Sequence, residues 1–222
     1  VVVGEAAKAE AGEHPLTTIS SAKRLMGRAA SELGADAAAL PYRVEAGTRG
    51  TSRIVLPDGR PVSPEEVSAA VLRELKLRAE RELDGPVEKA VVTVPAYFDD
   101  AQRQATRVAG RLAGLDVIRL VPEPTAAALA YGLGLHRAPG SGPLHVVVYD
   151  LGGGTFDVSV LRLTPGTAEE PFFFQVLAVG GDTRLGGDDV DRLLAREVWG
   201  DDAEDAGERR RRMAEAERLK IL

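Results

Sequence analysis

The sequence predicts a mixed α/β protein, on three observations. Between residues 63 and 132, segments with helical spacing of apolar residues alternate with short β-branched runs, as in a domain with a parallel sheet. After residue 143, three apolar runs follow with only turns between them, which indicates an antiparallel meander. The end of the chain then returns to helical spacing.

The first 62 residues predict a peripheral region. Residues 20–27 mix basic and apolar positions and suit a short helix. Residues 40–61 contain Pro and Gly between short β-like runs such as Arg53–Leu56, which is typical of a hairpin. The chain lacks an initiator Met, opens on Val1–Val3 like the middle of a strand, and ends inside a helical pattern. We therefore expect an internal fragment of a longer protein.

The helix that begins after Ser63 has the clearest start signal. Ser63 is a good N-cap, Pro64 suits the first helical position, and two glutamates follow where the helix dipole favours acids. Apolar residues recur at helical spacing up to Leu83, and Gly85–Pro86 ends the helix.

The later elements follow in order. We expect strands at 90–94, 117–121, 144–149, 156–163 and 172–179, and helices at about 100–113, 124–132, 188–197 and 207–222. The pattern changes across the spacer 138–143, which places a lobe boundary near Gly140.

Composition excludes several classes of protein. The net charge of −6 argues against a nucleic-acid partner, and the absence of cysteine excludes disulfides and thiolate metal sites. The three histidines have no metal-like spacing, and the run Arg209–Arg212 lies among acids, as on a solvated helix face. With no apolar stretch of membrane-spanning length and no signal peptide, we expect no membrane partner and a cytoplasmic location.

The segment Asp150–Asp157 is the most informative motif. Three glycines, Gly152, Gly153 and Gly154, join one apparent strand to the next, whereas Rossmann and Walker loops open a helix. Amides without side chains can close on phosphate oxygens, and Thr155 adds a hydroxyl. Asp150 and Asp157 offer oxygen ligands for a hydrated Mg2+. An ordinary tight hairpin is the alternative.

Four segments together resemble the DnaK-type chaperones, the seventy-kilodalton heat-shock family of the actin-like ATPases. The motif Asp150–Asp157 resembles the second phosphate loop of that family. The others are Thr18–Arg28, Val94–Thr106 and Glu123–Ala128, in the expected order. Within the family, Ile19–Arg28, Phe98–Asp100 and Gly186–Asp189 resemble the HscA branch, which serves iron–sulfur cluster assembly.

The resemblance implies an actin-like, ribonuclease-H-like fold of two lobes, here incomplete. Lobe I would cover 1–140, with a peripheral part at about 1–62 and a core part at 63–140. The lobe II core would cover 141–187, and residues 188–222 would begin its outer part. The implied activity is hydrolysis of Mg2+-bound ATP, with ADP as product. The implied partners are a J-domain co-chaperone and an unfolded or scaffold-protein client.

The resemblance also assigns roles to single residues. Lys23, Glu123 and Asp150 would be catalytic, and Asp150 and Asp157 would hold the metal through water. Pro95 and Arg103 would couple the nucleotide to a substrate domain. Nucleotide binding would fall to Gly152, Gly153, Gly154, Thr155, Gly186, Gly187, Glu217, Lys220 and Ile221.

Plainer interpretations stand beside these roles. Spacing alone favours a solvated surface lysine at Lys23 and an exposed salt-bridge face for Glu217 and Lys220. Glu123 also suits a helix N-terminus, and Pro95 also suits a strand end.

The chain departs from the family at three places. Pro122 replaces the usual Asn, Ile221 replaces an adenine-stacking Arg, and the loop 164–171 is long. Rival functions are a sugar or acetate kinase of the same fold, an actin-like filament protein, and an inert nucleotide-binding regulator.

Overall fold

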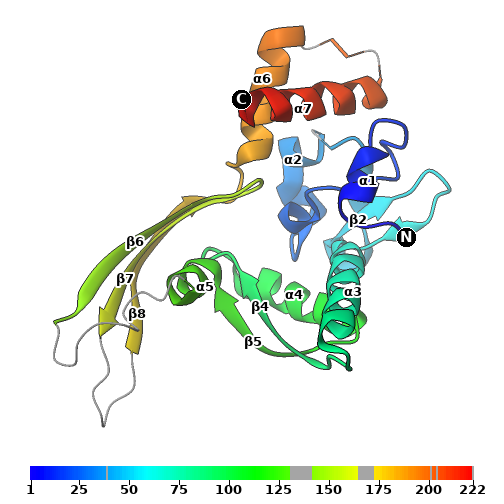
Figure 1. Ribbon diagram of the computed structural model, residues 1–222. Coiled ribbons are helices and arrows are strands. Elements are labelled where there is room, and N and C mark those ends of the chain that lie inside the picture. The colour runs from blue at the N-terminus through cyan, green and yellow to red at the C-terminus, as the bar shows by residue number, and fades with distance from the viewer. Residues whose placement is uncertain (39, 131–141, 165–172, 201, 204, 222) are drawn as a thin grey trace. The chain divides into compact units, whose positions relative to one another are not determined.

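The computed structural model describes residues 1–38, 40–130, 142–164, 173–200, 202–203 and 205–221 (Figure 1). It divides into two compact units, each described here by itself. Unit 1 contains Val1–Ala90, Asp99–Ile118 and Asp188–Leu222, and unit 2 contains Val91–Phe98 and Arg119–Gly187. The predicted lobes stay a prediction, and the boundary expected near Gly140 lies outside the described residues.

Unit 1 begins with small elements around an antiparallel sheet in the order β1-β2-β3. Ile54 of this sheet packs with Leu25, Leu33 and Tyr42 in a buried cluster. The hairpin region predicted at 40–61 is therefore confirmed. The elements are α1 (Glu5–Ala9), the 3-10 turn η1 (Ala22–Leu25), α2 (Ala30–Ala38), β1 (Arg43–Ala46), the 3-10 turn η2 (Thr48–Gly50), β2 (Ser52–Val55) and β3 (Pro61–Val62).

The structure differs from the sequence-based expectations at three places in this region. The helix expected at 20–27 is a single 3-10 turn, η1. Helices α1 and α2 were not predicted, because α1 buries no residue and Gly34 interrupts α2 with φ 43°. Val1–Val3 form no strand.

Two capped helices follow in unit 1. In α3 (Pro64–Leu83) the Ser63 hydroxyl accepts from the Glu66 N–H, and the Glu66 carboxylate accepts from the Ser63 N–H. Asp99 and Gln102 form the same capping box for α4 (Asp100–Leu112). These reciprocal bonds satisfy donors that a helix start otherwise leaves unpaired. Both predicted helix starts are confirmed.

Helices α3 and α4 pack together through small residues. One buried cluster contains Met26, Ala105 and Ala109, and another contains Ala69, Ala113 and Leu115. Leu72 of α3 contacts both. Strands β4 (Lys89–Val94) and β5 (Asp116–Pro122) form a two-stranded sheet. Both predicted strands are confirmed, and the division between the units passes through them.

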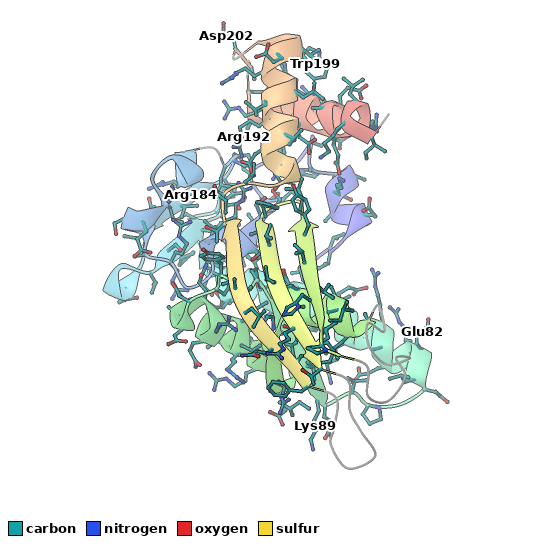
Figure 2. All side chains as sticks on the ribbon, turned by 90° about the vertical axis from the view of Figure 1, so that its left-hand side faces the viewer. Glu82, Lys89, Arg184, Arg192, Trp199 and Asp202 are labelled. Carbon is teal, nitrogen blue, oxygen red and sulfur yellow. The ribbon has the colours of Figure 1, made fainter. Side chains whose placement is uncertain are left out.

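The sheet of unit 2 is antiparallel, with β7 (Phe156–Thr164) between β6 (Leu144–Leu151) and β8 (Phe173–Asp182) (Figure 2). This confirms the meander. Helix α5 (Glu123–Ala130) covers one face, where Ala128 packs with Leu161 and Leu163. The predicted end of α5 at 132 and the long loop at 164–171 lie outside the described residues, apart from Thr164.

Two helices end the described chain, α6 (Gly187–Trp199) and α7 (Ala206–Ile221), and both were predicted. The mixed α/β class is thus confirmed. No helix in the described ranges is long and apolar enough to cross a membrane.

Candidate functional site

The three glycines occupy a hairpin turn in unit 2. Strand β6 ends at Leu151 and β7 begins at Phe156, so Gly152–Thr155 form the connection, named here the glycine turn. The Gly152 N–H donates to the Thr155 carbonyl at 2.9 Å and closes it. The prediction that the glycines join strand to strand is confirmed. In this structure the Gly152 amide is therefore hydrogen-bonded within the turn.

The two predicted metal carboxylates are cross-strand neighbours beside this turn. Asp150 of β6 lies opposite Asp157 of β7 in the register. Side chains at opposite positions of an antiparallel pair project from the same face. Asp157 shares its face with Leu161, at alternating positions along β7, and this is the face that α5 covers. Asp157 is only 2% exposed, whereas Asp150 is half-buried.

This pair of carboxylates fits a hydrated metal ion better than a directly caged one. Within the described residues, no group of three or more His, Asp or Glu side chains gathers as a metal cage. Mg2+ gives up its water reluctantly and is commonly held through one or two carboxylates plus phosphate oxygens. Asp150 and Asp157 would suit that role, with the metal neutralising charge on bound phosphates.

A second glycine pair packs against the glycine turn. A Cβ on Gly186 would lie 2.4 Å from the Gly153 carbonyl oxygen, closer than any side chain can approach. The Gly187 N–H donates to the Gly152 carbonyl at 2.9 Å. The structure thus brings together two predicted site segments that lie more than thirty residues apart in the sequence. Gly186 is required here because only a bare backbone fits.

Glu123 lies in the same unit, as the first residue of α5 directly after Pro122 ends β5. Its side chain is partly exposed.

Two buried hydroxyls of unit 2 were not predicted from the sequence, Thr125 Oγ1 and Ser159 Oγ. Within the described residues, neither has a hydrogen-bond partner. Buried polar atoms of this kind commonly bind an ordered water or ligand atom. The alternation of Asp157, Ser159 and Leu161 was the available signal.

Lys23 lies in unit 1, on the turn η1, and its side chain is exposed. The backbone of this turn is fixed by its neighbours: Leu25 and Met26 are buried. A Cβ on Gly27 would lie 2.6 Å from the Gln102 amide nitrogen, so Gly27 packs directly against the start of α4. Its φ of +66° also favours glycine.

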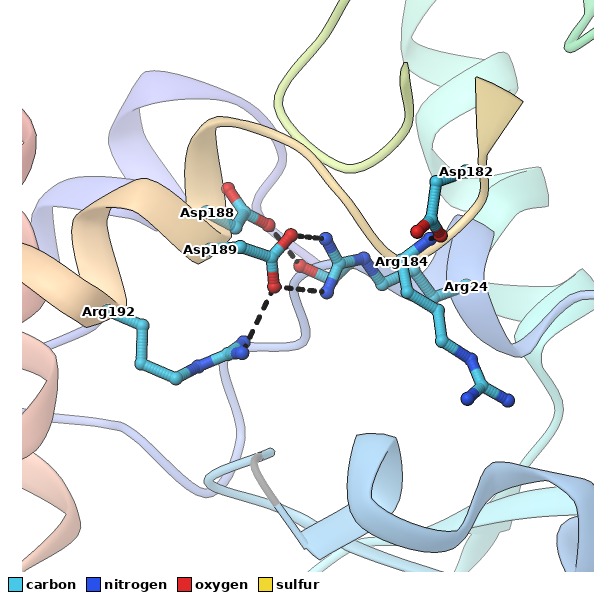
Figure 3. A network of polar contacts seen from close by, with 7 residues as sticks. Arg24, Asp182, Arg184, Asp188, Asp189 and Arg192 are labelled. Carbon is cyan, nitrogen blue, oxygen red and sulfur yellow. Dashed lines mark hydrogen bonds and ion pairs between the residues drawn. The ribbon is translucent and has the colours of Figure 1, made fainter. Parts of the chain in front are cut away.

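The start of α6 contacts the Lys23 turn through charged groups (Figure 3). The Ser21 hydroxyl donates to Asp188 at 2.8 Å. Arg24 donates to both carboxylate oxygens of Asp189, at 3.2 and 2.5 Å. Arg192 also contacts Asp189, at 3.0 Å. The Arg24–Asp189 pair is largely buried, with side chains 9% and 16% exposed.

The residues expected at adenosine lie on α7, also in unit 1. Glu217 pairs with Lys8 at 2.7 Å, and this hydrogen bond raises the pKa of Lys8. Lys220 pairs with the buried Asp191 at 2.7 Å. Ile221 is 76% exposed. Both charged residues thus form ion pairs with other elements, and their nucleotide role stays a prediction.

The expected coupling residues lie on either side of the division between the units. Pro95 is fully buried directly after β4, and its carbonyl accepts from the Phe98 N–H. This position agrees with a strand terminator as well as with a coupling residue. Arg103 lies in the first turn of α4, where its N–H donates to the Asp99 carbonyl. The coupling role of both residues stays a prediction.

Each unit therefore holds part of the predicted site. Unit 2 holds the glycine turn, Asp150, Asp157, Gly186 and Gly187, which the structure brings together, and it also contains Glu123. Unit 1 holds Lys23, Arg103 and the three predicted residues of α7. A common cleft that would join the two sets of residues stays a prediction.

Comparison with known proteins gives one family. The model of the family described as "Hsp70 protein" matches residues 1–220. The "Chaperone protein HscA homolog" of Azotobacter vinelandii strain DJ is 55% identical over 195 residues, which is 88% of this chain and 30% of that protein. The protein of the same description from Laribacter hongkongensis is 58% identical over 193 residues, or 86% of this chain and 29% of that protein. The chain therefore spans about 30% of the length of these curated relatives.

Proposed function

The chain belongs to the Hsp70 family, and from this membership we propose that it forms part of the ATP-binding and ATP-hydrolysing domain of a molecular chaperone. The proposal includes the two-lobed actin-like fold and binding of ATP and ADP with Mg2+. The family match favours this activity over a sugar kinase or a filament protein. The sequence match to relatives named as chaperones supports the same choice.

One observation carries the proposal from the structure. The glycine turn lies beside two carboxylates on one face of the sheet, and the bare backbone of Gly186 packs against it. Glycine amides and a hydroxyl suit phosphate oxygens, and the carboxylates suit the hydrated metal that accompanies them.

The reaction would be in-line attack of water on the γ-phosphate, without a covalent enzyme intermediate. The ammonium of Lys23 would stabilise charge that develops on the transferring phosphoryl group. Glu123 and Asp150 would orient the attacking water, and Asp157 would hold the metal through water together with Asp150. Mg2+ supplies charge neutralisation when bound. Glu217, Lys220 and Ile221 would line the adenosine after the two ion pairs of α7 rearrange.

We further propose an HscA-like role, in which the parent chaperone works in the cytoplasm with a J-domain co-chaperone on an unfolded or scaffold-protein client. The identity of 55–58% to relatives named HscA homologs supports this branch. A J-domain protein and a scaffold peptide should then each accelerate ATP hydrolysis by the full-length protein. If neither of these accelerates hydrolysis, the HscA-like role is contradicted, whereas the ATPase proposal is not affected.

The test of the ATPase proposal is Mg2+-dependent hydrolysis by the full-length protein that contains this chain. Asp150→Asn keeps the size of the side chain and removes its charge, and it should lower the single-turnover rate by about a hundredfold or more. The matched control is Asp58→Asn, since Asp58 lies on the peripheral hairpin and pairs with Arg60. Wild-type protein without Mg2+-dependent hydrolysis, or Asp150→Asn with an unchanged rate, would contradict the proposal.

A further inference from the structure

The stretch Thr18–Gly27, named here the lysine segment, is held at several points by parts of unit 1 that are distant in sequence. Arg210 of α7 donates to the Thr18 carbonyl at 2.9 Å. The Tyr42 hydroxyl donates to the Ser20 carbonyl at 2.5 Å, and burial raises the pKa of Tyr42. At the other end Gly27 packs against α4. The segment is therefore clamped on both sides of Lys23.

The contacts nearest to Lys23 come from α6. Ser21 lies two residues before Lys23 and bonds to Asp188, and Arg24 lies directly after it and bonds to both oxygens of Asp189. A bidentate arginine–carboxylate pair fixes orientation as well as distance. This pair is mostly shielded from water, so solvent screens it less than a surface pair.

The backbone at Ser21, beside these contacts, has an unfavourable conformation. Ser21 has φ 55°, in the left-handed region that is unfavourable for a residue with a Cβ. It stands at the cap of η1, but its side chain makes no capping bond there. The hydroxyl binds Asp188 instead. The contact with α6 thus stabilises the turn that sets the direction of η1.

The position of the Lys23 ammonium depends on this turn. The Lys23 side chain starts from η1, so the backbone of this turn sets the region that the ammonium can reach. Catalytic stabilisation of a phosphoryl group depends steeply on placement, because an error of about 1 Å can cost about a hundredfold in rate.

We propose that Asp189 is a positioning residue for hydrolysis: through its bidentate bond to Arg24 it fixes the turn that presents Lys23, with Asp188 and Ser21 as a second anchor. This inference rests on the proposed ATPase function. Two stretches that carry the HscA resemblance meet at this turn: the lysine segment itself and Asp188–Asp189.

The first experiment separates positioning from binding. In the full-length protein, Asp189→Asn removes the charge and keeps the shape of the side chain. Single-turnover hydrolysis should fall about tenfold to a hundredfold, while the Kd for ATP should stay within about twofold. Arg192→Gln is the matched control, because it removes the exposed partner of Asp189 and leaves Arg24 in place. An Asp189→Asn rate equal to wild type would overturn the inference, as would Arg192→Gln falling as far as Asp189→Asn.

The second experiment tests whether Asp189 acts through Lys23. In a Lys23→Ala background, Asp189→Asn should cause no further loss of the residual rate, because the group it positions is gone. An equal further loss would overturn the inference. Exchanging the charges, with Arg24→Asp and Asp189→Arg together, should recover part of the rate that either change alone removes. If the double variant folds and recovers none of the rate, the result would also contradict the proposed role of the Arg24–Asp189 pair.

A milder variant distinguishes a loss of positioning from a folding defect. If Asp189→Asn does not unfold cooperatively like wild type, Ser21→Ala replaces it; the expected fall in rate is smaller and in the same direction, with unchanged Kd. An unchanged rate in Ser21→Ala would then overturn the inference. If Lys23→Ala itself hydrolyses ATP at the wild-type rate, the catalytic role in the proposed function fails. If Lys23→Ala is inactive and Asp189→Asn is normal, only the positioning inference fails.

Discussion

The glycine turn and the lysine segment reach a fixed conformation by different means. The glycine turn is held by backbone: its register runs along two adjacent strands, and Gly186 contacts it with no side chain between. The lysine segment is held mainly by side chains, from residues up to 192 positions away in the sequence. The first should therefore be sensitive to added atoms and the second to lost charges and hydrogen bonds.

The largest expected effect is at Lys23. In the full-length protein, Lys23→Ala should lower the single-turnover rate of ATP hydrolysis by about a hundredfold to a thousandfold, because the ammonium acts on charge that develops during transfer. Equilibrium binding of ATP should change little. Measuring both separates catalysis from affinity. Near wild-type hydrolysis would remove Lys23 from catalysis and leave only structural contacts in the lysine segment.

Gly186→Ala tests whether the glycine turn is limited by steric fit. The new Cβ would collide with the Gly153 backbone, which has no flexible end to move aside. We expect a loss of about 1–3 kcal/mol in unfolding free energy and a weaker affinity for ATP. The control is Gly180→Ala on β8, where an added Cβ meets nothing within 4 Å. Equal behaviour of the two variants in denaturant unfolding and ATP titration would contradict the close approach.

Gly27→Ala tests a place where the lysine segment also depends on backbone contact. Gly27 combines a φ of +66° with a predicted clash against α4, whereas Gly59 has a φ of +84° and open space. Gly59→Ala should cost about 1–2 kcal/mol from conformation alone. Gly27→Ala should cost about 1 kcal/mol or more beyond that. Urea unfolding of both variants gives the difference, and a difference of zero would show that the contact with α4 adds nothing.

Ile221→Arg should have the smallest effect, which is on the rate of ADP release. Ile221 lies outside both the glycine turn and the lysine segment. An Arg could stack on adenine, and about 1.4 kcal/mol of added affinity would slow ADP release about tenfold. Stopped-flow release of a fluorescent ADP analogue from the full-length protein measures it, with Leu219→Arg as the control for added charge. An Ile221→Arg variant that releases ADP as fast as wild type would remove this residue from the nucleotide site.

Local signals predicted the elements whose causes lie within a few residues. The N-cap at Ser63 and the strands around the glycine turn are of this kind, and both are confirmed. Helix α1 could not be predicted because its five residues bury no side chain, and its Lys8 pairs with Glu217 on α7. This contact joins α1 to a partner that sequence spacing does not reveal.

The candidate site also has a part that the sequence predicted and a part that only the structure shows. Sequence motifs pointed to Lys23, the glycines and the carboxylates, but the Arg24–Asp189 bond joins residues 165 positions apart. No periodicity links such positions. The salt-bridge interpretation of Glu217 and Lys220 foresaw ion pairs along one helix face, whereas both residues pair with residues outside α7. Composition indicates that such residues will pair, but the fold decides with which partner.

The three-stranded sheet of unit 2 also predicts which backbone protons exchange with solvent. Strand β7 pairs on both sides, so its amides should exchange slowly along its whole length. Strand β6 pairs only with β7 in the described residues, so every second amide should exchange quickly. A two-residue alternation in deuterium uptake along Leu144–Leu151 would thus report a free edge in the 222-residue chain. Uniform protection of the same amides in a longer protein would report another strand beside it.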